Sequence, residues 1–152
     1  MKRLAVVLII GVLWIGFSEN IIAGQKGTEV FTNLGGFIPH SGAGIFFVGA
    51  NIDQNLGSSL MLTGDANVMW FLYIPVGFEY GGILNFKIKN TFFGAGISRW
   101  TPFGCGGETM LKMNIGIKME KVRASLFIYT DLGNPFEHGN VLVGIQAGYQ
   151  LK

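Results

Sequence analysis

Hydrophobic and polar residues alternate along most of this chain with a period of two, which is the period of a β-strand. From Val141 to Leu151 every odd-numbered residue is apolar, and the residues between them are mostly Gly or Gln. The same alternation covers 44–52, 70–83, 91–99, 109–120 and 122–131, and weaker versions cover 28–37 and 57–65. The pattern predicts about eight strands, each with one apolar face and one face of Gly and polar residues.

The connections between these segments alternate between short and long. Tight turns are predicted at 53–57, 84–90 and 120–121, and longer loops at 38–43, 63–68, 100–108 and 132–140. The last two loops are rich in Gly, Pro and Asn, which favour turns and irregular structure. Three turns at one end and four loops at the other are the connections of an eight-stranded antiparallel up-and-down barrel. The predicted fold is therefore all-β, with residues 25–152 as one barrel domain.

The first 24 residues have the pattern of a secretory signal peptide. Lys2 and Arg3 precede an apolar run over residues 4–17, which is too short for a transmembrane helix. We expect cleavage between residues 18 and 24. No stretch downstream has 18 consecutive apolar residues, so helical membrane spans are not predicted there.

Alternation by itself does not say which face of the strands points outward. Two features favour a transmembrane barrel with a polar lumen. No charged residue is predicted mid-strand on the apolar face, where a charge facing lipid costs about 2–4 kcal/mol. Glycine and charged residues share the other face, as the crowded interior of a small barrel requires. The alternative is a soluble secreted barrel, lipocalin-like and ligand-binding, with its apolar face inward. If the chain is a transmembrane barrel, we expect the charged residues of the polar face to form a network in the lumen: Glu79, Lys112, Lys118, Glu120, Arg123 and Asp131.

The composition narrows the function classes. Charged residues make up 13% of the 152 residues, about half the usual share, and 24 residues are glycine. High hydrophobicity with low charge excludes a disordered chain, and a net charge of +2 without a basic patch excludes a nucleic-acid partner.

Catalytic and metal-binding patterns are absent from the sequence. His40 and Ser41 are adjacent in a predicted loop without a supporting motif, and His138 and Cys105 also lie in predicted loops. Two histidines and one cysteine have no metal-ligand spacing, and no Gly-rich segment joins a strand to a helix. We therefore predict no enzyme activity, no metal and no cofactor.

Three segments carry a resemblance to a known family. They are 74–80 (IPVGFEY), 92–97 (FFGAGI) and 143–151 (VGIQAGYQL). Over residues 28–152 the chain resembles the small outer-membrane β-barrel proteins of Gram-negative bacteria, the OmpA/OmpX-like and OmpW-like group. The resemblance implies a location in the cell outer membrane. It also implies contact with outer-membrane lipids, including lipopolysaccharide, and with the barrel-assembly machinery.

The expected role is structural: membrane integrity, or surface interaction through the loops of a monomer. The alternative is a narrow pore for small solutes or ions. Candidate contact residues lie in the two longest predicted loops: Trp100, Phe103, Phe136 and His138.

Overall fold

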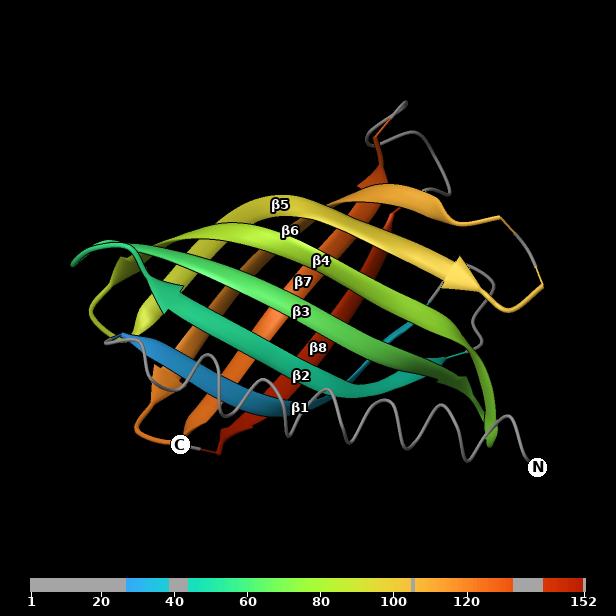
Figure 1. Cartoon of the computed structure of the whole chain (residues 1–152), viewed down its shortest axis with the longest axis horizontal. Helices are drawn as coiled ribbons and strands as arrows, with labels where there is room; N and C mark the ends of the chain where they lie inside the picture. The colour runs from blue at the N-terminus through green and yellow to red at the C-terminus, as the bar shows by residue number, and fades with distance from the viewer. Residues whose placement is uncertain (1–26, 39–43, 105, 133–140, 152) are drawn as a thin grey trace.

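The computed structural model describes residues 27–38, 44–104, 106–132 and 141–151 (Figure 1). Eight strands form one closed barrel, in which each strand pairs antiparallel with its sequence neighbours and the first strand pairs with the last. The predicted eight-stranded up-and-down barrel is confirmed. The strands are β1 (Thr28–Ile38), β2 (Ile45–Asn55), β3 (Leu60–Phe71), β4 (Ile74–Ile88), β5 (Thr91–Pro102), β6 (Glu108–Met119), β7 (Val122–Asp131) and β8 (Leu142–Gln150).

The predicted signal peptide, residues 1–24, lies outside the described residues. Within the residues that the structure describes, no helix has the length and apolar character needed to cross a membrane.

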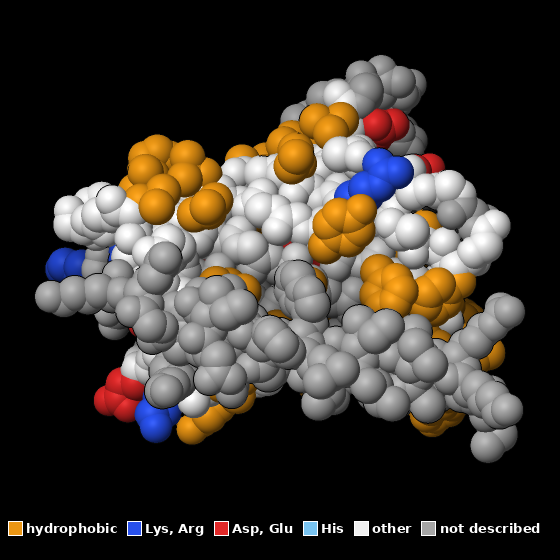
Figure 2. All heavy atoms as spheres, viewed as in Figure 1, with side chains coloured by type: hydrophobic (Ala, Val, Ile, Leu, Met, Phe, Trp, Pro, Cys, Tyr) orange, Lys and Arg blue, Asp and Glu red, His pale blue; other side chains and the backbone are white. Residues whose placement is uncertain are grey.

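The apolar face of the strands points outward. Exposed apolar side chains occur on the outer face of all eight strands, and several of them are visible in orange in Figure 2. Ile145 on β8 is 64% exposed, whereas Gln146, the next residue along the strand, is 8% exposed. This arrangement is the reverse of a soluble ligand-binding barrel, and it suits a barrel surrounded by lipid. Arg99, near the end of β5, is the only charged strand residue in the described part of the chain that faces outward.

Glycines on the inner face allow the strands and the lumen side chains to come close together. A Cβ atom on Gly96 of β5 would overlap the carbonyl oxygen of Gly82 on β4. A Cβ atom on Gly144 of β8 would overlap the ring of Phe127. Gly96 therefore lets the backbones of β4 and β5 come close together, and Gly144 provides the room that the Phe127 ring occupies.

The connection between β3 and β4 differs from the prediction. A loop was expected at 63–68, but β3 continues through Phe71 and turns at Leu72 and Tyr73. Thr63, Asp65 and Asn67 are polar because they face the lumen, where all three are buried. The predicted turn at 84–90 is also too long, because β4 runs to Ile88 and the turn has two residues.

Three of the connections are two-residue turns, and each begins with a non-glycine residue at positive φ. These residues are Leu72 (φ 54°), Lys89 (φ 55°) and Glu120 (φ 45°). The turns that begin at Lys89 and Glu120 lie at the end of the barrel that holds Thr28 and Gln150, which we call the turn end. Leu72 lies at the opposite end, the loop end.

Candidate functional site: the barrel interior

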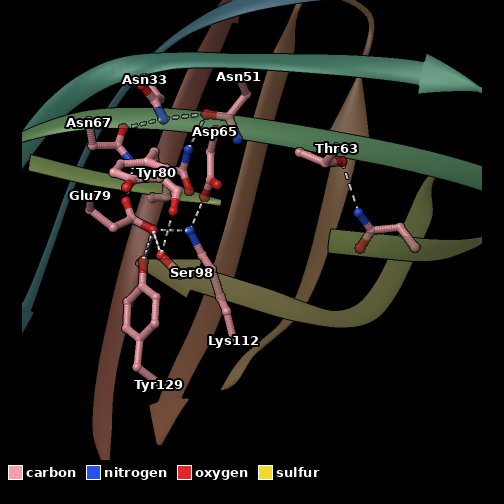
Figure 3. Close-up of polar contacts among 12 residues, drawn as sticks. Asn33, Asn51, Thr63, Asp65, Asn67, Glu79, Tyr80, Ser98, Lys112 and Tyr129 are labelled. Atoms are coloured by element: carbon pink, nitrogen blue, oxygen red, sulfur yellow. Dashed lines mark hydrogen bonds and ion pairs between the residues drawn. The ribbon is translucent and has the colours of Figure 1, made fainter. Parts of the chain in front are cut away.

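A buried lysine joins three strands at the centre of the lumen. The ammonium group of Lys112 on β6 pairs with Asp65 on β3 and lies 2.9 Å from Oε1 of Glu79 on β4 (Figure 3). The three side chains are at most 2% exposed. Buried charges are tolerated only where they are paired and hydrogen-bonded, so this cluster is a strong constraint on the barrel.

Glu79 is the centre of the hydrogen bonds in this cluster. Its Oε1 accepts a hydrogen bond from the Ser98 hydroxyl at 2.6 Å and from the Tyr129 hydroxyl at 2.8 Å, and its Oε2 accepts one from Asn67. Donors from β3, β5, β6 and β7 therefore converge on one carboxylate of β4. Such a network fixes the positions of five strands through a single side chain.

A row of amide side chains extends this network to the strands that close the barrel. Asn33 on β1 donates to Asn51 on β2 and to Asn67 on β3, the latter at 3.0 Å. Gln146 on β8 donates to Asn51 at 2.7 Å. Each of the eight strands thus contributes at least one residue to the amide row or to the carboxylate cluster beside it, with Lys112 from β6 and Tyr129 from β7.

A second ion pair lies nearer the turn end. Arg123 on β7 donates to Oδ1 of Asp53 on β2 at 2.6 Å, and Thr63 donates to the same oxygen at 2.7 Å. The guanidinium carbon of Arg123 lies 4.4 Å from the centre of the Phe92 ring. Both charged groups are at most 4% exposed, so this pair closes the lumen a second time.

Aromatic rings fill the lumen near the loop end. Trp100 lies 4.7 Å from Phe37 and 5.3 Å from Tyr129, and Phe127 lies 5.1 Å from Tyr129, measured between ring centres. Phe47 joins them, with its ring centre 5.6 Å from that of Phe127. The described interior therefore holds an apolar layer towards the loop end and polar layers in the middle.

The structure places the predicted lumen residues at three different depths. Glu79, Lys112 and Arg123 are buried in the interior. Lys118 faces inward at the turn end, where it pairs with Glu29 and stays about a quarter exposed. The prediction is wrong for Glu120, which is exposed in the turn between β6 and β7.

Asp131 lies at the other end of β7, beside the loops. It shares the inner side with Met110 by register but is exposed at the rim.

Several interior residues were missed by the sequence reasoning. Asp65 and Asn67 fell inside a predicted loop, and Asn33, Asn51 and Asp53 were assigned no role. A signal was present, because Thr63, Asp65 and Asn67 occur at alternate positions, as Asn51 and Asp53 also do. Polar residues at period two are the pattern of a lumen-facing strand.

The predicted loop contacts are only partly loop residues. Trp100 is not a loop contact, because β5 continues to Pro102 and the indole packs inside the barrel against Phe37. Phe103 does lie in the connection between β5 and β6, 48% exposed, with its ring edge-on to Phe78 at 5.2 Å. The other two predicted loop contacts, Phe136 and His138, lie outside the described residues, as do His40, Ser41 and Cys105.

The described residues contain no group of three or more His, Cys, Asp or Glu side chains able to hold a metal ion. The acids of the interior are instead divided between two basic side chains, Lys112 and Arg123.

Comparisons with known proteins agree with the geometry at the level of the fold. No family model and no curated protein matches the chain. A structure from the de novo design of transmembrane β-barrels matches with a TM-score of 0.61 and 10% identity, covering 84% of this chain and 98% of that one. The N-terminal β-barrel domain of Pseudomonas aeruginosa OprF matches with a TM-score of 0.58 and 15% identity, with the same coverage of both chains.

The de novo designed TMB2.3 matches similarly, with a TM-score of 0.59, 14% identity, and coverage of 84% of this chain and 98% of that one. At such low identities the likeness shows the fold alone. The chain therefore has the fold of the small eight-stranded transmembrane β-barrels. The likeness to OprF agrees with the OmpA-like part of the expected resemblance, and the OmpW-like part stays a prediction.

Proposed function

We propose that the protein is a non-enzymatic outer-membrane barrel with a closed lumen, whose role is structural and interactive rather than conductive. The observation that carries this proposal is the cluster in which Lys112 of β6 meets Asp65 and Glu79 across the lumen. A water-filled channel needs an open path through this layer, whereas the three side chains that meet there are almost completely buried.

The layers on either side of the cluster support the same conclusion. Towards the loop end, the rings of Phe47, Phe127 and Tyr129 occupy the lumen, and each is at most 1% exposed. Towards the turn end, the pair of Arg123 and Asp53 forms another barrier. Eight-stranded barrels have interiors just wide enough to be filled by side chains. The interior of this chain follows that rule.

The membrane environment is supported by the outward apolar face. We propose that this face lies in the outer membrane, with lipids that include lipopolysaccharide as its main partners and with assembly by the barrel-assembly machinery. The protein should then be recovered from the outer-membrane fraction, and the folded form should migrate differently from the heated form on a gel. Recovery as a soluble periplasmic protein would contradict this placement.

Conductance in planar lipid bilayers tests the closed lumen. We expect the purified wild-type barrel to give no steady current. The same measurement on the variant Phe47→Ala/Phe127→Ala, whose folding is checked by the same gel shift, tests whether these two rings of the apolar layer are needed to block the current. Reproducible single-channel steps from the wild-type protein would overturn the closed-lumen proposal in favour of a narrow pore.

A further inference from the structure

A cavity of about 220 Å³ opens at the turn end of the barrel. The floor is formed by Met61 of β3 and Phe92 of β5, each 2% exposed. The remaining lining comes from Lys87 of β4 and Lys118 of β6, from Lys89 and Asn90 in the turn between β4 and β5, and from Thr91 at the start of β5. The cavity is therefore a vestibule at one mouth of the lumen.

The charges around this vestibule are unbalanced. Three of its lining residues are lysines, and no acidic residue lines it. Lys118 pairs with Glu29, but Lys87 donates to the neutral amide of Asn55. Among the described residues, none forms a hydrogen bond or ion pair with the ammonium group of Lys89. Two of the three positive charges thus have no acidic partner within the described structure.

The neighbouring groups are also hydrogen-bond donors. Thr91 has a hydroxyl group and Asn90 an amide group, and both line the same cavity as the lysines. Lysine binds phosphate as a mobile point charge, and hydrogen bonds between an ammonium group and an anionic oxygen are stronger than neutral ones. A small tetrahedral oxyanion accepts several such bonds at once, and a cavity of this size can hold it.

We propose that the vestibule binds a phosphate group, with Lys87 and Lys89 as its main ligands and Lys118, Asn90 and Thr91 as further donors. The buried Arg123, paired with Asp53, lies over the ring of Phe92 at the cavity floor, so a phosphate bound here does not have to pass through the lumen. A phosphate can reach it as a free anion, or as the head group of an anionic phospholipid that leans over the rim.

Nuclear magnetic resonance on the full-length barrel in a neutral detergent tests the site. Inorganic phosphate is titrated at constant ionic strength, with sodium chloride as the balancing salt, so that general screening does not change. We expect saturable shifts of the backbone amide signals over 87–92 and at Lys118. Shifts that rise without saturation, or that spread evenly over all lysines, would overturn the proposal.

Two charge-neutralising variants make this test specific. Lys87→Gln/Lys89→Gln removes both proposed ligands and should weaken phosphate binding about tenfold or more, because two charge-assisted hydrogen bonds are lost. Lys121→Gln is the matched control, because Lys121 lies in a turn at the same end and does not line the cavity. Equal affinity in the double variant and the wild type would contradict the site.

Lipid nanodiscs distinguish the two sources of phosphate. The barrel is compared in phosphatidylcholine discs with and without phosphatidylglycerol, in the absence of added phosphate. A head-group ligand predicts the same shifts with phosphatidylglycerol alone, and these shifts should disappear in the double variant. A free-anion ligand predicts shifts only when inorganic phosphate is added. If neither probe moves these signals, the vestibule is not a phosphate site.

Discussion

Replacing Lys112 by methionine is the most direct test of the interior network. The change leaves the carboxylates of Asp65 and Glu79 buried together without a cation. At the 2.9 Å between Lys112 Nζ and Glu79 Oε1, one ion pair amounts to roughly 6 kcal/mol of attraction at an effective dielectric constant of about 20. The desolvation that folding already imposes on the ions offsets part of this attraction.

The expected loss of unfolding free energy for Lys112→Met is therefore about 3–5 kcal/mol, the usual result of removing one partner from a buried pair. The triple variant Lys112→Met/Asp65→Asn/Glu79→Gln removes the charges as well. It should recover most of that loss, because neutral replacements of a buried ionic cluster are tolerated. Lys121→Met, at an exposed turn position, is the control and should change stability by about 0.5 kcal/mol or less.

The assay is urea unfolding of the barrel refolded into phosphatidylcholine vesicles, followed by tryptophan fluorescence and by the gel shift of the folded form. If Lys112→Met costs less than about 1 kcal/mol, the cluster does not hold the lumen as inferred. If the triple variant is as unstable as the single one, the loss comes from packing and not from uncompensated charge.

Three further predictions use the same unfolding assay or lipid quenching. Gly96→Ala should destabilise the barrel by about 1–3 kcal/mol, because the added Cβ would meet the backbone of β4, whereas Gly57→Ala adds a Cβ in open space and should leave the stability unchanged. Equal effects of the two changes would contradict the close approach of β4 and β5. Glu120→Gly should stabilise the barrel by about 1 kcal/mol, because glycine adopts the positive φ of this position without strain. A loss of stability would show that Glu120 is not strained there. Tyr73 is 94% exposed in an apolar turn, so brominated lipid should quench the fluorescence of the tryptophan in Tyr73→Trp more strongly than that of the tryptophan in Lys121→Trp, which lies in a charged turn. Equal quenching would place the Tyr73 turn in water.

Most of the fold could be predicted because a barrel wall has only two environments. A strand between lipid and a filled lumen alternates with a period of two, and the period is visible in sequence even where β-propensity is weak. The tight turn at Glu120 and Lys121 was therefore predicted correctly. The turn at Leu72 and Tyr73 was not, because it contains neither Gly, Pro, Asn nor Asp.

The interior site could be predicted only in part, because the sequence places a charged residue on the inner face without showing which residue across the lumen it pairs with. Glu79, Lys112 and Arg123 were selected by their face and charge. Asp65, which completes the cluster, was lost when its polar neighbours were interpreted as a loop. Pairing across the lumen depends on strand stagger, and no local pattern records the stagger of a closed barrel.

The ion pairs of the interior also divide the chain into two unlike halves. In the four ion pairs identified among the described residues, the acidic partners lie on β1–β4 and the basic partners on β6 or β7: Glu29, Asp53, Asp65 and Glu79 on one side, and Lys112, Lys118 and Arg123 on the other. Two copies of the first half would bring like charges together, so incorrect pairing between identical halves is disfavoured. Halves divided between Lys89 and Asn90 should instead recognise each other, and their association would close the barrel.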